Sequence, residues 1–416
     1  GIGSVYAADG VDIASTFTDS TFRKYVSENF DTDGNGYLSD DEIAAVKTVD
    51  VSKCAPAIIS LEGVQMFTGL TELNCSGQGI RNLNIQNLTT LEQIDVSNNM
   101  ISSLTLPVEA DNLVYLDVSN NHITSLTSLS EYDNLTFLNA NVTNLSEISV
   151  ANMKNLAYLG VNATTISKLD LSANTNLRIL ECRAMTAMSE LDVSNHPELV
   201  TLLCDSASDK LKSSLTKLNV SGDTSLVKVD CSMSNISDLD ISNTPALETL
   251  NCSNSKLDNI DVSANKSLKE LNVSNNTLGK LDISSNINLE ILSASEIGIT
   301  DIDVSNQRAL TTLDLSGNKL VGIDVSKNES LDNLDLNDNN LEQIDVSKNV
   351  KLTSLTLDNN SLVCIDISKN TYLYDGNHKS TFSCYGNTRN ITLEKPNFDF
   401  DLTQYSIDYG FHKWWD

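Results

Sequence analysis

A 21-residue period governs most of this chain and limits the folds it can adopt more than any other feature. Leucine begins each line of the repeat, as at Leu289, Leu310, Leu331 and Leu352, at intervals of 21 residues. Each line reads L-x-x-L-x-(V/L)-x-x-N-x-L-x-x-L-D-(V/I)-x-x-N-x-x. A fixed period of this length is typical of a solenoid, in which each repeat forms one coil and neighbouring coils share a core.

The spacing of apolar residues within a repeat predicts two short strands. Apolar residues at positions 4 and 6 lie on one face of a strand of period two, and positions 11, 14 and 16 do the same on the opposite side of the coil. One coil cannot bury both faces alone, so we expect the coils to stack. Asparagine at positions 9 and 19 falls where the chain turns, and a buried amide there can bind backbone groups that leave the strand.

We expect fourteen such repeats between residues 70 and 372. They begin at Leu70, Leu91, Leu113, Leu135, Leu156, Leu177, Leu199, Leu226, Leu247, Leu268, Leu289, Leu310, Leu331 and Leu352. The intervals are 21 or 22 residues except from Leu199 to Leu226, where an interval of 27 indicates a looped-out insertion near Ser206–Ser213.

The pattern resembles the bacterial leucine-rich repeat of the 21-residue kind, sometimes called IRREKO, over about three quarters of the chain. The resemblance implies an α/β-type, mostly β solenoid with short parallel strands on both faces of each coil. It implies little about function, because one fold serves many. Outside the repeats we expect a signal-peptide remnant and tag over 1–10, a helical cap over 11–50, an irregular first coil over 51–69, and a C-terminal cap with the start of a further β module over 373–416.

Residues 31–42 match the calcium-binding loop of an EF-hand at every position. A hard cation needs six or seven oxygens that converge on one point, and Gly36 permits the sharp turn this requires. The ligands we expect are Asp31, Asp33, Asn35, the carbonyl of Tyr37, Ser39 directly or through water, and a bidentate Glu42.

The chain has no second loop of this kind, so one structural Ca²⁺ that rigidifies the cap is favoured over a calcium sensor. A dockerin, which the loop also resembles, needs two loops, so cohesin docking is not expected. The alternative is a decayed helical cap that binds no metal.

The N-terminal residues indicate export. Residues 5–9 (VYAAD) read as the end of a signal peptide cleaved after Ala7, so we expect a secreted or cell-surface protein. Residues 19–29 carry the pattern of a short amphipathic helix, with Asp19 as its N-cap and Phe22 and Val26 on its apolar side.

The net charge of −29 argues against nucleic acid and anionic membranes as partners. No apolar run approaches 18 residues, so no membrane insertion is expected. The four histidines lie far apart, and no P-loop, nucleophile elbow or zinc-protease motif is present. We therefore expect a monomeric protein that is not an enzyme.

Most of the cysteines follow the repeat. Cys75, Cys182, Cys204, Cys231 and Cys252 all occupy position 6, an inward position. Stacking in register does not favour disulfide geometry, so buried thiols are expected there. Cys54, Cys364 and Cys384 lie outside this column, and a Cys364–Cys384 bridge remains open.

Deviations from the repeat in several consecutive coils mark a candidate binding site. Position 3 points outward on the concave face, the usual binding surface of such solenoids, and in repeats 3–6 it reads Tyr115, Phe137, Tyr158 and Ile179. Aromatic residues make up 5% of the chain, so this column is unusual. Exposed rings are common anchors for a partner, and we place a ligand site there together with Glu181, Arg183 and Asp205. The alternative is that the rings pack along the sheet and bind nothing.

A column of aspartates raises a different question. Position 15 is aspartate in seven consecutive repeats, namely Asp240, Asp261, Asp282, Asp303, Asp324, Asp345 and Asp366. Stacked carboxylates about 5 Å apart repel one another. Either a row of cations offsets this repulsion, or each carboxylate accepts hydrogen bonds from its own turn, including the serine at position 17. The regular spelling of the repeat favours the second answer and predicts lower stability in acid.

Two functions remain open. The first is a recognition module that binds a protein or glycan at a cell surface through its concave face. The second is a structural spacer that presents another domain.

Overall fold

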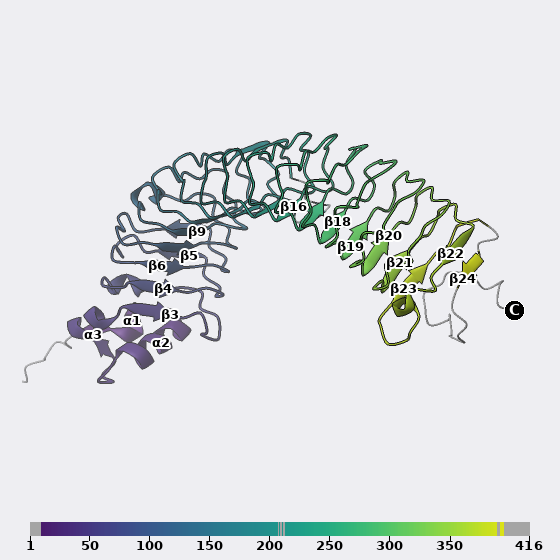
Figure 1. Cartoon of the computed structure of the whole chain (residues 1–416). Helices are drawn as coiled ribbons and strands as arrows, with labels where there is room; N and C mark the ends of the chain where they lie inside the picture. The colour runs from purple at the N-terminus through teal and green to yellow at the C-terminus, as the bar shows by residue number, and fades with distance from the viewer. Residues whose placement is uncertain (1–9, 207, 209, 211–212, 389–391, 395–416) are drawn as a thin grey trace, which may run out of the picture. The chain divides into compact units, whose positions relative to one another are not determined.

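The computed structural model describes residues 10–206, 208, 210, 213–388 and 392–394. They form two compact units, Gly1–Asp192 and Val193–Asp416. In each unit the backbone winds as stacked coils (Figure 1), and the chain is a mostly β, parallel solenoid of about 15 coils with few helices. The sequence therefore predicted the fold class correctly. The signal-peptide remnant, apart from Gly10, and most of the expected C-terminal β module lie outside the described residues.

A small cap precedes the first coil of the first unit (Figure 1). It holds β1 (Val11–Asp12), α1 (Ile13–Thr16), α2 (Ser20–Phe30), β2 (Tyr37–Leu38) and α3 (Asp40–Ala45). Asp19 is the N-cap of α2, because its Oδ1 accepts from the backbone N–H groups of Thr21 at 2.9 Å and Phe22 at 3.0 Å. The helix expected over 19–29 is confirmed. Its buried Phe22 packs edge-on against Phe17 in the core of the cap.

One long parallel sheet face runs through the coils of each unit. In the first unit its strands are β3 (Thr48–Asp50), β4 (Glu72–Asn74), β6 (Gln93–Asp95), β8 (Tyr115–Asp117), β9 (Phe137–Asn139), β10 (Tyr158–Gly160) and β11 (Ile179–Glu181). In the second unit they are β13 (Thr201–Leu203), β15 (Lys228–Asp230), β16 (Thr249–Asn251), β17 (Glu270–Asn272), β18 (Ile291–Ser293), β19 (Thr312–Asp314), β20 (Asn333–Asp335), β21 (Ser354–Thr356) and β23 (Thr381–Ser383). In the repeats these three-residue strands cover positions 3–5 and pair in exact register, so equivalent residues form columns.

The other side of the coils is less regular than the sequence suggested. Strands there are β5 (Asn82–Asn84), β7 (Ser103–Thr105), β12 (Glu190–Asp192), β14 (Lys217–Asn219), β22 (Cys364–Asp366) and β24 (Thr392–Glu394). In the other described coils the residues equivalent to these strands are not in strand conformation. Short 3₁₀ segments lie at Val64–Met66, Leu129–Glu131 and Thr371–Leu373.

The core follows the repeat. All fourteen leucines predicted at position 1 are fully buried. The five position-6 cysteines are buried thiols, and no disulfide joins Cys364 to Cys384. Burial raises the pKa of the Cys75 thiol, which makes it a poor nucleophile. None of the described helices is long or apolar enough to cross a membrane.

Buried asparagines join successive coils, as predicted. The Asn318 amide donates at 2.9 Å both to the Ala294 carbonyl of the preceding coil and to the Leu315 carbonyl of its own coil, while its Oδ1 accepts from Ile297 N–H at 3.1 Å. At position 19, Asn286 donates at 2.9 Å to the carbonyls of Val262 and Asn265. These contacts tie each coil to the one before it, and at the Val262 and Asn265 carbonyls they add to backbone bonds from Asn265 N–H and Leu268 N–H.

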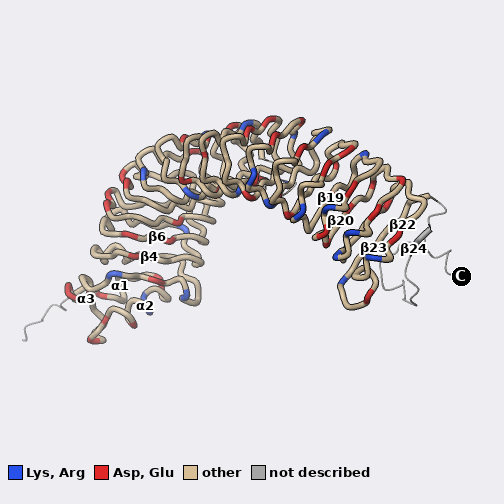
Figure 2. Tube along the Cα trace, in the orientation of Figure 1, with Lys and Arg blue, Asp and Glu red and all other residues tan. Residues whose placement is uncertain are grey.

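Acidic residues recur along both units and outnumber basic ones (Figure 2). The aspartate column of the second unit is explained by local hydrogen bonds. The Oδ1 of Asp282, for example, accepts from the Ser284 backbone N–H at 2.9 Å. The backbone and hydroxyl of Ser284 lower the pKa of the Asp282 carboxyl, and the serine two residues on does the same along the column. The structural interpretation of the column is therefore confirmed.

We expect this column to make the second unit less stable in acid. A carboxyl whose folded-state pKa lies below its unfolded value of 3.8 contributes stability above that value and loses it as the pH falls through the folded pKa. The combined change Asp261→Asn, Asp282→Asn and Asp303→Asn keeps the acceptor oxygen of each turn but removes its titration. Urea unfolding followed by circular dichroism at pH values from about 6 down to about 3 should show a shallower loss of stability in this variant.

A matched control changes Asp238, Asp258 and Asp301 to asparagine, since these exposed residues lack a serine two positions on. An equal flattening of the pH dependence in the control would contradict the explanation.

Candidate functional site

Three rings on the long sheet of the first unit form a continuous stack. Tyr115, Phe137 and Tyr158 occupy the same position of β8, β9 and β10 and are paired in register. Neighbouring ring centroids lie 4.4 Å apart, with interplanar angles of 6° and 9°. We call these three residues the aromatic stack. Each is half-buried, and Ile179, 37% exposed, follows Tyr158 in register on β11.

Face-to-face packing determines which part of each ring is available. The faces turned toward a neighbouring ring in the stack are covered, so the exposed surface consists mainly of ring edges. The alternative that the rings pack along the sheet is therefore correct as a description of their contacts. It does not remove them as a binding surface, because their exposed edges still form an apolar ridge.

A polar group adjoins the stack at Tyr158. The carboxylate Oε2 of Glu181 accepts from the Tyr158 hydroxyl at 3.2 Å, from Asn162 Nδ2 at 3.1 Å and from Asn141 Nδ2 at 3.4 Å. We call Asn141, Tyr158, Asn162 and Glu181 the Glu181 cluster. It fixes the Glu181 side chain on the sheet surface beside the ridge.

Gly160 makes room for this cluster. A Cβ at residue 160 would lie 2.7 Å from both amide atoms of Asn141 and 2.8 Å from the Tyr158 hydroxyl. Asp95, Asp117, Asn139 and Glu181 occupy the corresponding position on other strands. The glycine therefore lets Tyr158 and Asn141 approach Glu181.

The turns next to the site depart from the repeat. Val142, Ala163 and Ala184 have left-handed φ angles of 54°, 54° and 53°. In other coils asparagine often holds this conformation, for example Asn98 and Asn120. A β-branched valine with positive φ is an outlier, and such strain clusters at functional sites. Val142 is also 52% exposed, which adds apolar surface at the rim of the same coils.

The adjacent position 9 also changes. Thr143 replaces the buried asparagine, and its hydroxyl donates to the Ala140 carbonyl of its own coil at 2.9 Å. Asn121, one coil earlier, instead reaches back to the Val96 carbonyl of the preceding coil at 3.0 Å. The turn at Thr143 therefore lacks the amide link to the preceding coil that Asn121 makes.

Carboxylates flank the other end of the stack. Asp117 is 8% exposed, and its Oδ2 accepts from Asn139 Nδ2 at 3.1 Å. Burial raises the pKa of Asp117 despite hydrogen bonds from Ser119, and neighbouring Asp95 raises it further. Burial, with the charges of Asp117 and Asp95, raises the pKa of Tyr115 to about 12. Within the described ranges, Asp95, Asp117 and Glu181 form no ion pair with a lysine or arginine.

The structure brings together most of the predicted ligand site. Five of the predicted residues lie on the neighbouring strands β8–β11, namely Tyr115, Phe137, Tyr158, Ile179 and Glu181. Arg183 follows β11, and its N–H donates to Asn162 Oδ1 at 2.6 Å. Asp205 belongs to the second unit, where it is buried two residues after β13.

The ligand site predicted from the sequence did not include Asp95, Asp117, Asn141, Gly160 or Asn162. One feature of the sequence could have indicated the Glu181 cluster. Position 5 of β8–β11 carries a polar side chain except at Gly160, which leaves space on the sheet surface.

The predicted calcium loop lies between α2 and α3 and contains β2. Carboxylate oxygens of Asp31, Asp33 and Glu42 all lie within 4.8 Å of one another. Two oxygens on opposite sides of a calcium ion are about 4.8 Å apart, since each Ca–O distance is about 2.4 Å. The carboxylates therefore fit around one ion, and Tyr37 begins β2 at the position expected to offer its carbonyl.

Hydrogen bonds preorganise the rest of the loop. Asn35 N–H donates to Asp31 Oδ1 at 3.2 Å. Ser39 and Glu42 form a capping box on α3, in which Ser39 N–H donates to Glu42 Oε2 at 2.8 Å and Glu42 N–H donates to Ser39 Oγ at 3.1 Å. The Ser39 backbone and Thr32 lower the pKa of Glu42 to about 2, so it is charged at neutral pH. β1, which precedes the loop in the chain, pairs antiparallel with β2 inside it.

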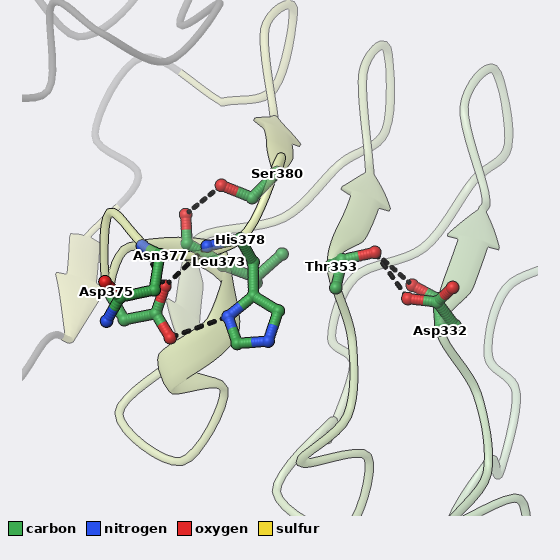
Figure 3. Close-up of polar contacts among 7 residues, drawn as sticks. All are labelled: Asp332, Thr353, Leu373, Asp375, Asn377, His378 and Ser380. Carbon is green, nitrogen blue, oxygen red and sulfur yellow. Dashed lines mark hydrogen bonds and ion pairs between the residues drawn. The ribbon is translucent and has the colours of Figure 1, made fainter.

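A turn in the second unit holds a further polar group (Figure 3). His378 Nδ1 lies 2.8 Å from Asp375 Oδ2, and the His378 ring stacks on Tyr372 with centroids 3.9 Å apart. On neighbouring strands the Thr353 hydroxyl donates to the Asp332 carboxylate (Figure 3). These contacts are local to the turn and the strands, and we assign them no ligand.

Solved structures with the same architecture include bacterial repeat proteins. The functional domain of InlJ from Listeria monocytogenes, described as including a cysteine ladder, is 28% identical with a TM-score of 0.79, covering 91% of this chain and 83% of that one. The internalin InlF from the same species is 19% identical with a TM-score of 0.53, covering 95% and 99%. This chain folds as a leucine-rich repeat solenoid.

The fold also occurs in a receptor. The ectodomain of the Arabidopsis thaliana receptor kinase GASSHO1/SCHENGEN3, solved in complex with CASPARIAN STRIP INTEGRITY FACTOR 2, is 19% identical with a TM-score of 0.57, covering 81% of this chain and 46% of that one. At this identity the likeness concerns the fold alone. No protein-family profile and no curated protein matches the sequence.

We predict that Gly160→Ala disrupts the Glu181 cluster while leaving the solenoid folded. The added methyl group would displace the Asn141 amide and the Tyr158 hydroxyl, which are the ends of side chains that can move. The loss of unfolding free energy should therefore stay below about 2 kcal/mol. In amide NMR spectra, the Asn141 and Asn162 side-chain signals should shift, with little change outside coils 135–192.

Gly322→Ala serves as the control, since a Cβ there meets nothing within 4 Å. Unchanged Asn141 and Asn162 signals in Gly160→Ala would show that the cluster does not depend on the missing side chain.

Proposed function

We propose that this protein is an exported recognition module that binds a protein partner through the aromatic stack on the long sheet of its first unit. The observation that carries this proposal is the half-exposed ridge of Tyr115, Phe137 and Tyr158 in a chain with 5% aromatic residues. Rigid aromatic side chains on a fixed scaffold are common centres of binding energy, because they bury a large area at little entropic cost.

The packing of the rings favours a protein over a glycan. A sugar ring stacks best on an open aromatic face, whereas the stack covers most of its faces with its own neighbours. Ring edges and the neighbouring Ile179 instead suit the apolar side chains of a protein segment. The receptor ectodomain supports the proposal in one respect: a solenoid of this fold was solved in complex with a bound factor.

Export agrees with the proposed role. The residues at positions 5–9 have the small-residue pattern of a signal-peptide cleavage site, which supports a binding face outside the cell. A strongly acidic surface keeps such a protein soluble and discourages adsorption to anionic membranes.

We predict that alanine at Tyr115, Phe137 and Tyr158 together weakens binding to a cognate surface protein by about thirtyfold or more, because truncation of a central anchor typically costs at least about 2 kcal/mol. The measurement is a screen of the purified protein against arrayed surface proteins and glycans, followed by a titration of each hit.

The matched control replaces Thr249, Glu270 and Ile291 by alanine, at the same position of β16, β17 and β18. Undiminished binding by the stack variant with an intact fold would contradict the proposed site. The absence of any hit would instead favour the spacer function.

We further propose that the loop over 31–42 binds one structural Ca²⁺. The convergence of three carboxylates within 4.8 Å supports this, because unscreened acidic groups at that distance repel one another. The oxygens of Asp31, Asp33, Asn35 and Glu42, the Tyr37 carbonyl and Ser39, directly or through water, would hold the ion. When bound it would lock α2 to α3.

We predict that calcium raises the unfolding temperature of the N-terminal cap and that Glu42→Gln abolishes most of this effect. Asp41→Asn is the control, since Asp41 also lies in the first turn of α3 but is not one of the predicted ligands. Calorimetric titration with CaCl₂ gives the stoichiometry, expected to be one ion per chain. Equal calcium binding by Glu42→Gln and wild type would exclude the proposed ligand set.

A further inference from the structure

We infer that the protein segment bound on the aromatic stack presents a lysine or arginine side chain to Glu181. This inference rests on the proposed function and names the chemistry of its partner. The site would therefore recognise an apolar residue with a basic residue near it, rather than an apolar surface alone.

The first reason is the way Glu181 is held. All three donors to its Oε2 (the Tyr158 hydroxyl and the amides of Asn141 and Asn162) are neutral. Its Oε1 accepts no hydrogen bond from any described residue. A charged oxygen is thus fixed in orientation next to the ridge and retains its full capacity for one more donor.

The second reason is that a neighbouring coil can supply a counter-charge to an acid on this side but does not do so for Glu181. In the second unit, Glu248 is paired with Lys269, whose Nζ lies 2.9 Å from the carboxylate. Among the described residues, Glu181 forms no ion pair with a lysine or arginine. Asp117 and Asp95, at the other end of the stack, add negative charge without an ion pair.

The third reason is the cost of covering this surface. A partner that buries the ridge also removes water from Glu181, and an ionised carboxylate without a counter-charge is expensive to desolvate. A neutral apolar segment would bear that cost in full. A segment with an ammonium or guanidinium group would replace the lost water by a charge-assisted hydrogen bond, and the net charge of −29 would speed its approach.

The test is a selection of peptides from a phage-displayed library of random dodecamers on the immobilised full-length protein. Wild-type protein should select peptides in which lysine or arginine lies within a few residues of an aromatic or branched aliphatic residue. Glu181→Gln retains a carbonyl acceptor for Tyr158, Asn141 and Asn162 but lacks the charge. Selection on this variant should lose the basic residue and keep the apolar one.

The effect can then be measured on a single peptide. The most frequent wild-type sequence, synthesised as a free peptide, should bind Glu181→Gln at least about tenfold more weakly, consistent with the loss of one charge-assisted contact. Its affinity for wild type should also fall as NaCl is raised, and that dependence should be smaller for the variant. Glu270→Gln on β17 is the matched control and should behave as wild type.

The outcomes separate the two proposals. Selected peptides that need Phe137 but show no basic residue, or that bind Glu181→Gln as tightly as wild type, overturn the inference about charge and leave the aromatic site in place. Peptides that bind equally to the Tyr115, Phe137 and Tyr158 alanine variant, or a selection that yields no sequence at all, overturn the proposed site itself. Circular dichroism of each variant confirms that the coils remain folded.

Discussion

Each coil of this protein depends on its neighbours for the hydrogen bonds of its own backbone. The strands have three residues each, so they cannot form a stable sheet by themselves. Their N–H groups bond to the adjacent coil, as Val273 does to Ser293 at 2.9 Å, and buried amides such as Asn318 bind the carbonyls at the turns. Stability is therefore a sum of contacts between nearest neighbours, and no coil contains a core of its own.

This dependence divides each coil into positions that must be kept and positions that can vary. Inward leucines and turn asparagines serve the neighbours, whereas outward side chains on the long sheet affect little besides the surface. The coils around the aromatic stack give up some of this support. Thr143 bonds only within its own coil, and Val142 adopts a backbone conformation that favours asparagine or glycine. Proteins commonly have lower local stability at a binding surface, because residues selected for function there are not those that stabilise the fold best.

The sequence predicted what the period controls. The fold, the buried leucines, the Asp19 cap of α2 and the role of the aspartate column follow from spacing and from hydrogen bonds between near neighbours in the chain. It overestimated the number of strands on the second side of the coil, because apolar spacing shows which residues face the core but not whether their backbone groups pair with a neighbouring coil. It found the column of rings but not the Glu181 cluster, which joins residues 19 to 40 positions apart in a geometry that Gly160 permits.

The exact register of the strands gives the first unit columns of side chains at a fixed spacing. Equivalent side chains recur at the strand separation of about 4.8 Å, while an extended polypeptide advances about 3.3 Å per residue. If a partner strand lay along the column, its successive residues would therefore not align with successive coils. About three of its residues span the same distance as two coils, so the two sets of side chains would align again only at that interval. Two coils are also the separation of Tyr115 from Tyr158. Such a surface matches a partner at discrete points, so spacing between contact residues becomes a source of discrimination that is independent of their chemistry.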